Sequence, residues 1–221
     1  MIRLYFGLPG AGKTTLMAKL AIDALNAKVF SHGKFVKKYE HVYCNVHTTI
    51  PGVTYIDNEC IGKYELRDCL ILVDEATLFA DSRDWKNFSG NRLEYFLTHR
   101  HYRADIYLFS QQWDAVDRKI RCITDRVYYI YKGFFTRPWI SKCYRIPYGI
   151  IIPDGKKTGN SEKLGEIIQG YRKPPLLTRM FAQLVFRPRY YRYFDSFETK
   201  SLPPLPEYYK PYNRAPMFDD Q

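Results

Sequence analysis

The residues with the clearest chemical potential form a glycine-rich run near the amino end of the chain. Gly7-Leu8-Pro9-Gly10-Ala11-Gly12-Lys13-Thr14 fits the pattern G-x-x-x-x-G-K-[ST]. In such a run the glycines let the backbone curl, so that several N–H groups point inward at phosphate oxygens. The helix that follows adds the positive end of its dipole. We expect a phosphate-binding loop made of Gly7, Pro9, Gly10, Ala11, Gly12, Lys13, Thr14 and Thr15.

Two side chains of this loop have specific expected roles with ATP and Mg²⁺. Lys13 can reach the β- and γ-phosphates, and the Thr14 hydroxyl can ligate the metal ion. The run lies between an expected strand, Ile2–Phe6, and an expected helix, Lys13–Leu25, which is the context that such a motif requires. The alternative is a glycine-rich turn that only connects the strand to the helix.

A pair of acids follows the apolar run Cys69–Val73. This has the form of a Walker B segment, in which a buried strand delivers a carboxylate beside the phosphate loop. We expect Asp74 to hold Mg²⁺ through water and Glu75 to orient or deprotonate an attacking water. The adjacent Glu75 argues against a small-molecule kinase. The alternative is that both acids are solvated and cap the following helix.

A polar residue also ends the next expected strand, Asp105–Ser110. We expect Gln111 to lie between the Walker B acids and the phosphates, in a sensing role, whereas Gln112 is one residue further away. The alternative for either residue is a surface amide at a strand terminus.

Arginines are concentrated on both sides of that strand, within Thr98–Arg103 and at Arg118 and Arg121. One of them could act as an arginine finger, a cation placed against the γ-phosphate of a neighbouring subunit. The alternative is that they are surface charges at helix ends. For His99 and His101 we expect hydrogen-bonding or core roles, because no partnered Cys or acid suggests a metal site.

The elements that position these residues alternate between strand and helix. Besides the segments named above, Val42–Val46 and Val53–Ile56 have strand patterns, and Asn91–Arg103 has a helical pattern. This alternation predicts an α/β fold, with a parallel sheet flanked by helices on both faces. From Arg126 a small β-rich extension is expected, with strands at Val127–Tyr131, Ile140–Ile146 and Gly149–Ile152.

The 221 residues suffice for one α/β domain with a modest appendage. We expect an ATPase core over residues 1–131, a basic, aromatic-rich extension over 132–200 packed on that core, and a Pro-rich extended tail over 201–221. The five cysteines are never spaced as C-x-x-C, so a disulfide framework or a zinc site is not indicated. No apolar run approaches the ~18–20 residues that span a bilayer.

The formal net charge of +11 favours polyanionic partners. Residues 132–200 carry 14 basic and 5 acidic side chains, and Arg187–Tyr193 interleaves arginines with tyrosines. This composition suits phosphate contacts with base stacking, and equally an anionic membrane surface. A third interpretation is that the tyrosines pack against the core while the arginines stay solvated.

Four segments together, GLPGAGKT, ILVDEATLF, HRHYRADIYLFSQ and YRYFDSFET, resemble the Zot-like family, the zonular occludens toxin domain of filamentous phage assembly ATPases. The resemblance implies a P-loop NTPase of the additional-strand class. It also implies ATP and Mg²⁺ as cofactors and an oligomeric ring that drives export of single-stranded DNA. Matched residues are Lys13, Thr14, Asp74, Glu75, Gln111 and Arg100.

One departure from the family concerns the membrane. Family members commonly continue into a membrane-spanning helix, whereas this chain ends in a polar, Pro-rich segment. We therefore expect a location in the host cytoplasm, at the cytoplasmic face of the inner membrane, reached through a membrane-anchoring or phage assembly protein. The alternative is that the chain is the ATPase portion of a longer protein.

The leading hypothesis is an ATP-hydrolysing motor for filamentous phage assembly and export, translocating single-stranded DNA as an oligomer. Two alternatives stay open. A small-molecule or nucleotide kinase also opens with such a glycine-rich run, and a nucleotide-gated scaffold would bind ATP with little turnover.

Overall fold

The computed structural model describes residues 1–76, 90–111, 116–132, 139–146 and 182–194. The expectations for Gln112, Gly149–Ile152 and the Pro-rich tail therefore lie outside the described residues. So does most of the basic stretch between 132 and 200, together with the side chain of Arg118.

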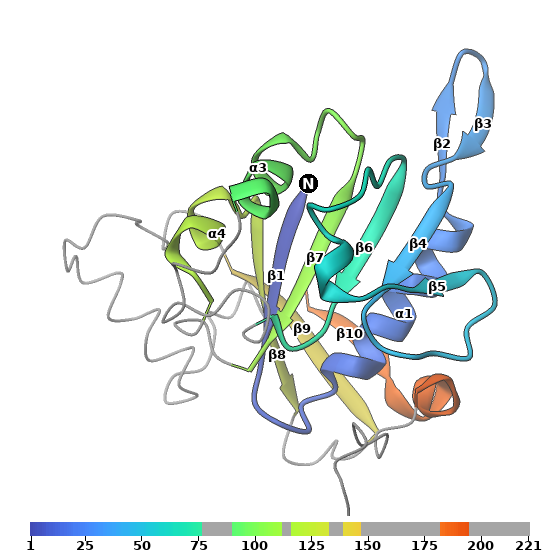
Figure 1. Cartoon of the computed structure of the whole chain (residues 1–221). Coiled ribbons are helices and arrows are strands. Elements are labelled where there is room, and N and C mark those ends of the chain that lie inside the picture. Colours follow the sequence, from blue (N-terminus) through green and yellow to red (C-terminus); the bar gives the residue numbers. More distant parts are fainter. Residues whose placement is uncertain (77–89, 112–115, 133–138, 147–181, 195–221) are drawn as a thin grey trace, which may run out of the picture.

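A central eight-stranded sheet organises the chain, in the order β10-β9-β8-β1-β7-β6-β4-β5 (Figure 1). All pairs from β5 to β8 are parallel, and β9 and β10 add to this sheet in antiparallel fashion. The strands are β1 (Ile2–Phe6), β4 (His41–Cys44), β5 (Val53–Tyr55), β6 (Cys69–Val73), β7 (Asp105–Ser110), β8 (Arg126–Lys132), β9 (Ile140–Ile146) and β10 (Gln183–Phe186).

The position of β7 confirms the expected fold class. β7 pairs with β1 on one side and with β6 on the other, so one strand separates the strand before the glycine-rich loop from the strand before the two acids. This inserted strand defines the additional-strand class of P-loop NTPases. All five residues of β6 are buried, as expected for a strand covered on both faces.

Helices cover both faces of the sheet, as predicted from the alternating pattern. α1 (Lys13–Asn26) lies on one face, and α3 (Gly90–Thr98) and α4 (Arg118–Ile123) lie on the other (Figure 1). Each face has its own apolar cluster, because successive strand residues point in opposite directions. Leu4 packs with Phe96 of α3, whereas the next residue, Tyr5, packs with Leu16 of α1.

The helix predicted over Asn91–Arg103 ends earlier, at Thr98. Two tight turns follow it, in which the His101 N–H donates to the Thr98 carbonyl and the Arg103 N–H donates to the Arg100 carbonyl. Arg103 has a φ of 51°, which no helix accommodates. The chain must reverse here to enter β7, and that requirement overrides the helical pattern.

A hairpin that the sequence analysis did not predict follows α1. Its strands, β2 (Lys28–Ser31) and β3 (Lys34–Lys37), pair antiparallel around His32-Gly33, where both residues have positive φ. That conformation suits a two-residue hairpin turn. The hairpin projects from the body of the molecule (Figure 1), and every residue of β3 is exposed.

The described part of the carboxyl-terminal extension joins the same sheet. After β10, a 3₁₀ segment, η3 (Arg187–Tyr193), lies beside α1 (Figure 1). Val185, Tyr190 and Phe194 are buried in the apolar cluster on the α1 face. Within the described residues all five cysteines are free, and no helix is long and apolar enough to cross a membrane.

Two glycines with positive φ allow a test of how α3 is seated. A Cβ on Gly62 would lie 2.5 Å from the Cα of Arg92 in α3, whereas a Cβ on Gly33 would meet nothing within 4 Å. Gly33→Ala should lower the free energy of unfolding by roughly 1–2 kcal/mol, which is the cost of a left-handed backbone at alanine. Gly62→Ala should cost more, because the backbone of α3 must also shift. Denaturant unfolding measures both, and equal costs would contradict close packing at Gly62.

Candidate functional site

The glycine-rich loop connects β1 to α1 at the carboxyl ends of the parallel strands. Gly10 has a φ of 69° and Gly12, the residue before α1, a φ of 100°. Left-handed backbone is readily adopted only by glycine, so these residue types are required by the curl of the loop. The N–H of Gly7 donates to the carbonyl of Ser110 at 3.2 Å, which ties the start of the loop to the end of β7.

The loop rests on β8 and β9, a support that the sequence analysis missed. A Cβ on Gly7 would lie 2.5 Å from the Ile130 carbonyl oxygen, and one on Gly12 would collide with the Ser141 hydroxyl. Ser141 is buried, and its hydroxyl donates to the Ala11 carbonyl at 2.6 Å. The β-rich extension therefore holds the loop in shape. No local signal marks Ser141, because 130 residues separate it from Ala11.

Lys13 is folded back onto its own loop. Its Nζ donates to the carbonyl of Gly7 at 3.0 Å and to that of Leu8 at 3.5 Å. Burial lowers the pKa of Lys13, and the nearby charges of Asp74 and Glu75 oppose that change. The loop carbonyls thus partly replace the water that burial removes from this cation.

Asp74 directly follows β6 and lies close to Lys13 and Thr14. Burial raises the pKa of Asp74, while the N–H of Glu75, the charge of Lys13 and the hydroxyl of Thr14 oppose this rise. A carboxylate and a hydroxyl, the oxygen donors expected for Mg²⁺, are therefore brought together beside the lysine.

Asn45 holds the backbone of Asp74 in place. The N–H of Asp74 donates to Asn45 Oδ1 at 2.7 Å, and Asn45 Nδ2 donates to the Asp74 carbonyl at 2.9 Å. Asn45 directly follows β4, the neighbour of β6 in the sheet. This residue was missed because the strand predicted over Val42–Val46 contains Asn45, whereas β4 ends one residue earlier, at Cys44.

Glu75 and Gln111 meet at the same edge of the sheet. Gln111 Nε2 donates to Glu75 Oε1 at 2.7 Å, which links the residue after β7 to the second acid after β6. Glu75 has a φ of 49°, an uncommon conformation for a residue with a side chain. Such backbone strain is concentrated at functional sites.

Arg100 does not reach the phosphate loop of its own chain. Its guanidinium pairs with Asp125 at 2.9 Å, and its side chain is 74% exposed. Asp125 accepts the N–H of Ile2, the first residue of β1, whereas the loop follows the last residue of that strand. Arg100 therefore lies at the amino ends of the parallel strands, whereas the loop lies at their carboxyl ends. His99 is buried, with Nδ1 2.7 Å from the Phe96 carbonyl oxygen.

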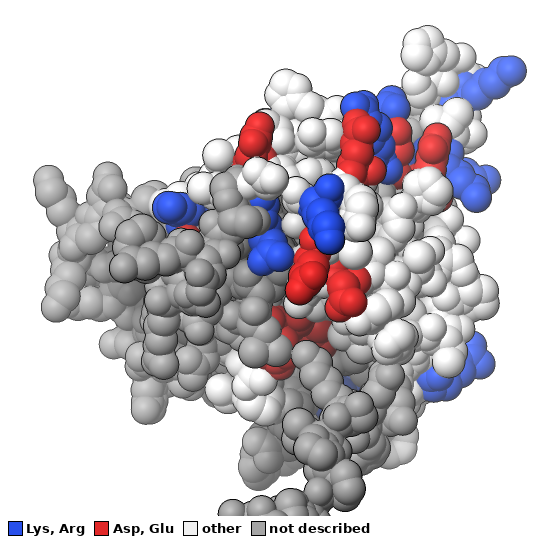
Figure 2. Space-filling view, in the orientation of Figure 1, with Lys and Arg blue, Asp and Glu red and all other residues white. Residues whose placement is uncertain are grey.

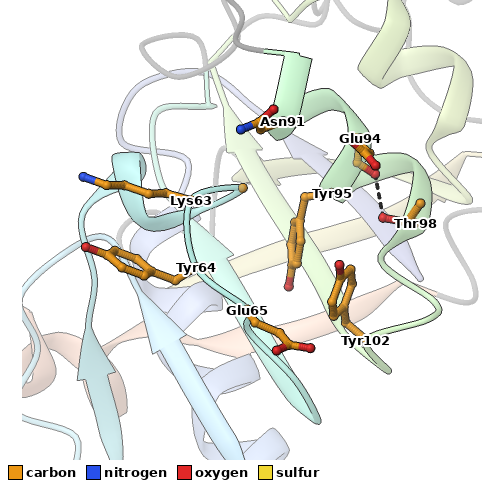
Figure 3. A pocket seen from close by; sticks show the side chains of 9 residues that line it. Lys63, Tyr64, Glu65, Asn91, Glu94, Tyr95, Thr98 and Tyr102 are labelled. Carbon is orange, nitrogen blue, oxygen red and sulfur yellow. Dashed lines mark hydrogen bonds between the residues drawn. The ribbon is translucent and has the colours of Figure 1, made fainter.

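A separate hollow of about 510 Å³ lies between the segment before β6 and α3 (Figure 3). The side chains of Tyr95 and Tyr102 line it, together with Lys63, Tyr64 and Glu65 (Figure 3). None of the expected site residues contributes to this hollow. It is therefore not the place where Lys13 and Asp74 would hold a ligand.

Charged side chains are mixed on the face shown in Figure 2. Among the described residues of this face, Lys and Arg are interspersed with Asp and Glu. The excess of basic residues falls between 132 and 200, most of which lies outside the described residues.

The raised pKa of Asp74 predicts that its ionised carboxylate lowers the stability of the fold at neutral pH. The folded chain binds this proton more tightly than the unfolded chain, so the contribution to stability is present at low pH and lost as pH rises through the raised pKa. Asp74→Asn should therefore raise the unfolding midpoint at neutral pH. The gain should shrink as pH falls toward about 3.9, the ordinary aspartate pKa.

Thermal unfolding without nucleotide, across a pH series, measures this gain. Asp23→Asn is the control, because Asp23 is exposed on α1. A lower midpoint for Asp74→Asn at neutral pH would show that the ionised carboxylate stabilises the fold.

Comparison with known proteins identifies the family and the fold of this chain. The family model described as Zonular occludens toxin (Zot) matches residues 1–148. The crystal structure of the N-terminal domain of zonular occludens toxin from Neisseria meningitidis superposes with a TM-score of 0.54 at 18% identity, over 88% of this chain and 98% of that chain.

A weaker similarity, with a TM-score of 0.46 and 13% identity, links 66% of this chain to 92% of the genome packaging NTPase of Sulfolobus turreted icosahedral virus 2, solved with AMPPCP. Curated proteins provide no significant match. The family match covers most of the chain, and the strand order is that of the additional-strand P-loop NTPases. The chain therefore belongs to the zonular occludens toxin (Zot) family.

Proposed function

We propose that this chain is an ATP-hydrolysing motor for filamentous phage assembly and export, which translocates single-stranded DNA as an oligomer. One observation carries the hydrolytic part of the proposal. Lys13, Thr14, Asp74, Glu75 and Gln111 come from three separate segments and meet at one edge of the sheet. Membership of the Zot family supports the role in phage assembly.

In the proposed site, each side chain acts on a triphosphate lying in the loop. Lys13 Nζ would leave the carbonyls of Gly7 and Leu8 and donate to the β- and γ-phosphate oxygens. Thr14 and Asp74 would hold Mg²⁺, which would neutralise part of the phosphate charge. These hard oxygen donors fit that ion.

Glu75 would accept a proton from the attacking water, and Gln111 would fix the orientation of the Glu75 carboxylate. The 2.7 Å hydrogen bond from Gln111 Nε2 to Glu75 Oε1 supports this pairing of roles. A kinase would direct its catalytic carboxylate at the hydroxyl of a bound acceptor, whereas an acid adjacent to the Walker B aspartate is expected to act on water. The contact therefore favours hydrolysis among the enzymatic functions.

Arg100 enters the proposal only as a group acting on a neighbouring subunit. It is exposed and lies at the sheet edge opposite the phosphate loop, so it would meet the site of another copy in a head-to-tail contact. Head-to-tail contacts close into rings when the rotation allows. The location we propose is the cytoplasmic face of the inner membrane, through a membrane-anchoring or phage assembly partner.

The role of Glu75 predicts a separation of binding from turnover. Glu75→Gln should bind ATP as the wild type does, while turnover should fall by about 10²–10⁴, the usual contribution of a general base. Isothermal titration and phosphate release measure the two quantities. Glu65→Gln is the control, because Glu65 is exposed and lies on the separate hollow. Wild-type turnover in Glu75→Gln would remove Glu75 from the mechanism.

The motor hypothesis predicts that the ATPase rate depends on assembly and on DNA. The rate per subunit should rise with protein concentration, because neighbours complete each site, and rise further with single-stranded DNA. Raising salt from about 50 to 200 mM should weaken DNA binding steeply, since phosphate contacts release counterions. Nucleotide binding with no turnover at any concentration would favour the scaffold, and turnover indifferent to DNA and to concentration would argue against a motor.

A further inference from the structure

We propose that Arg187 binds the α-phosphate of the nucleotide, in a subsite that the carboxyl-terminal extension adds to the phosphate loop. This inference rests on the proposed function, because it assumes a nucleotide in the loop formed by residues 7–14. It assigns a ligand contact to a segment more than 170 residues away from that loop in the sequence.

Arg187 is fixed against the loop by the end of the sheet. It directly follows β10, and its N–H donates to the Trp139 carbonyl at 2.7 Å, just before β9. Its Nε lies 3.2 Å from the point that a Cβ on Gly12 would occupy, and Thr15 Oγ1 lies 3.0 Å from the same point. The base of this guanidinium is therefore in contact with the loop where α1 begins.

The Nε of Arg187 is buried and has no hydrogen-bond partner within the described part of the chain. A buried N–H without an acceptor is costly, and more so when it belongs to a cation. No ion pair of Arg187 is found among the described residues either. Among the described residues, its charge contacts the Tyr191 ring, whose centroid lies 5.7 Å from the guanidinium carbon. An anion beside Gly12 would satisfy both the N–H and the charge.

The order of the strands identifies which phosphate that anion is. Lys13, Asp74 and Gln111 mark the γ-phosphate end, and the acids and the amide follow β6 and β7, on one side of β1. Arg187 follows β10 and, like Ser141 of β9, lies against Gly12, and both strands are on the other side of β1. A nucleotide extended along the loop therefore presents its α-phosphate, and not its γ-phosphate, to Arg187.

The test uses the full chain and non-hydrolysable probes. ADP and the two diastereomers of its α-phosphorothioate are titrated with Mg²⁺ by calorimetry into the wild type, Arg187→Gln and Arg187→Lys. Sulfur at the α-position weakens a hydrogen bond from a guanidinium, so one diastereomer should bind the wild type more weakly than ADP does. Arg187→Gln should weaken ADP binding about ten- to a hundredfold, as expected for a lost charge-assisted bond.

The decisive result is that Arg187→Gln no longer discriminates between ADP and the α-phosphorothioate diastereomer that binds the wild type more weakly. In Arg187→Gln, the weaker diastereomer should bind as well as ADP does, and Arg187→Lys should lie between this variant and the wild type. Arg189→Gln is the matched control, because Arg189 is exposed on the same η3 segment, and it should keep the wild-type pattern.

A purely structural role gives a different pattern. If Arg187 only supports the loop, Arg187→Gln weakens the binding of ADP and of both analogues by the same factor. The difference in affinity between ADP and the weaker diastereomer then persists, and this result overturns the proposal. Unchanged affinity also overturns it. Should Arg187→Gln fail to fold, Arg187→Lys keeps the charge and still has to alter the discrimination. If the wild type binds no nucleotide at all, the proposed function fails first.

Discussion

The candidate site depends on one constraint, which is that the backbone of the glycine-rich loop formed by residues 7–14 must stay tightly curled. Left-handed Gly10 and Gly12 provide the curl, and the loop presses so closely on Ile130 and Ser141 that side chains at Gly7 and Gly12 would collide with β8 and β9. In effect, β8 and β9 are a support for the loop. Folding of the extension and nucleotide binding should therefore be coupled.

The position of the loop also explains why charged residues lie close together beside it with shifted pKa values. Parallel strands bring their carboxyl ends to one edge, so Asp74, Glu75 and Gln111 are delivered beside the loop by the topology alone. The cost is a half-buried carboxylate and a buried lysine, and the pKa values of both are shifted toward their neutral forms. The attraction between the two charges and the carbonyls of Gly7 and Leu8 reduce that cost.

Elements buried on both faces were predictable from the sequence. β6 and β7 have the predicted bounds, since continuous apolar runs have one stable place in such a sheet. The hairpin of β2 and β3 was missed because its apolar residues are exposed and contact no core. Asn45 and Ser141 were missed because their roles come from contacts between distant segments, which no local pattern encodes.

The most direct measurement is a crystal structure of the chain with a non-cleavable ATP analogue and Mg²⁺. The account predicts the analogue in the loop formed by residues 7–14, with Lys13 Nζ moved from the Gly7 carbonyl onto phosphate oxygens. It also predicts the Glu75 carboxylate facing the γ-phosphate. An analogue bound elsewhere, or a loop in which Lys13 keeps its carbonyl partners at saturating analogue, would contradict the account.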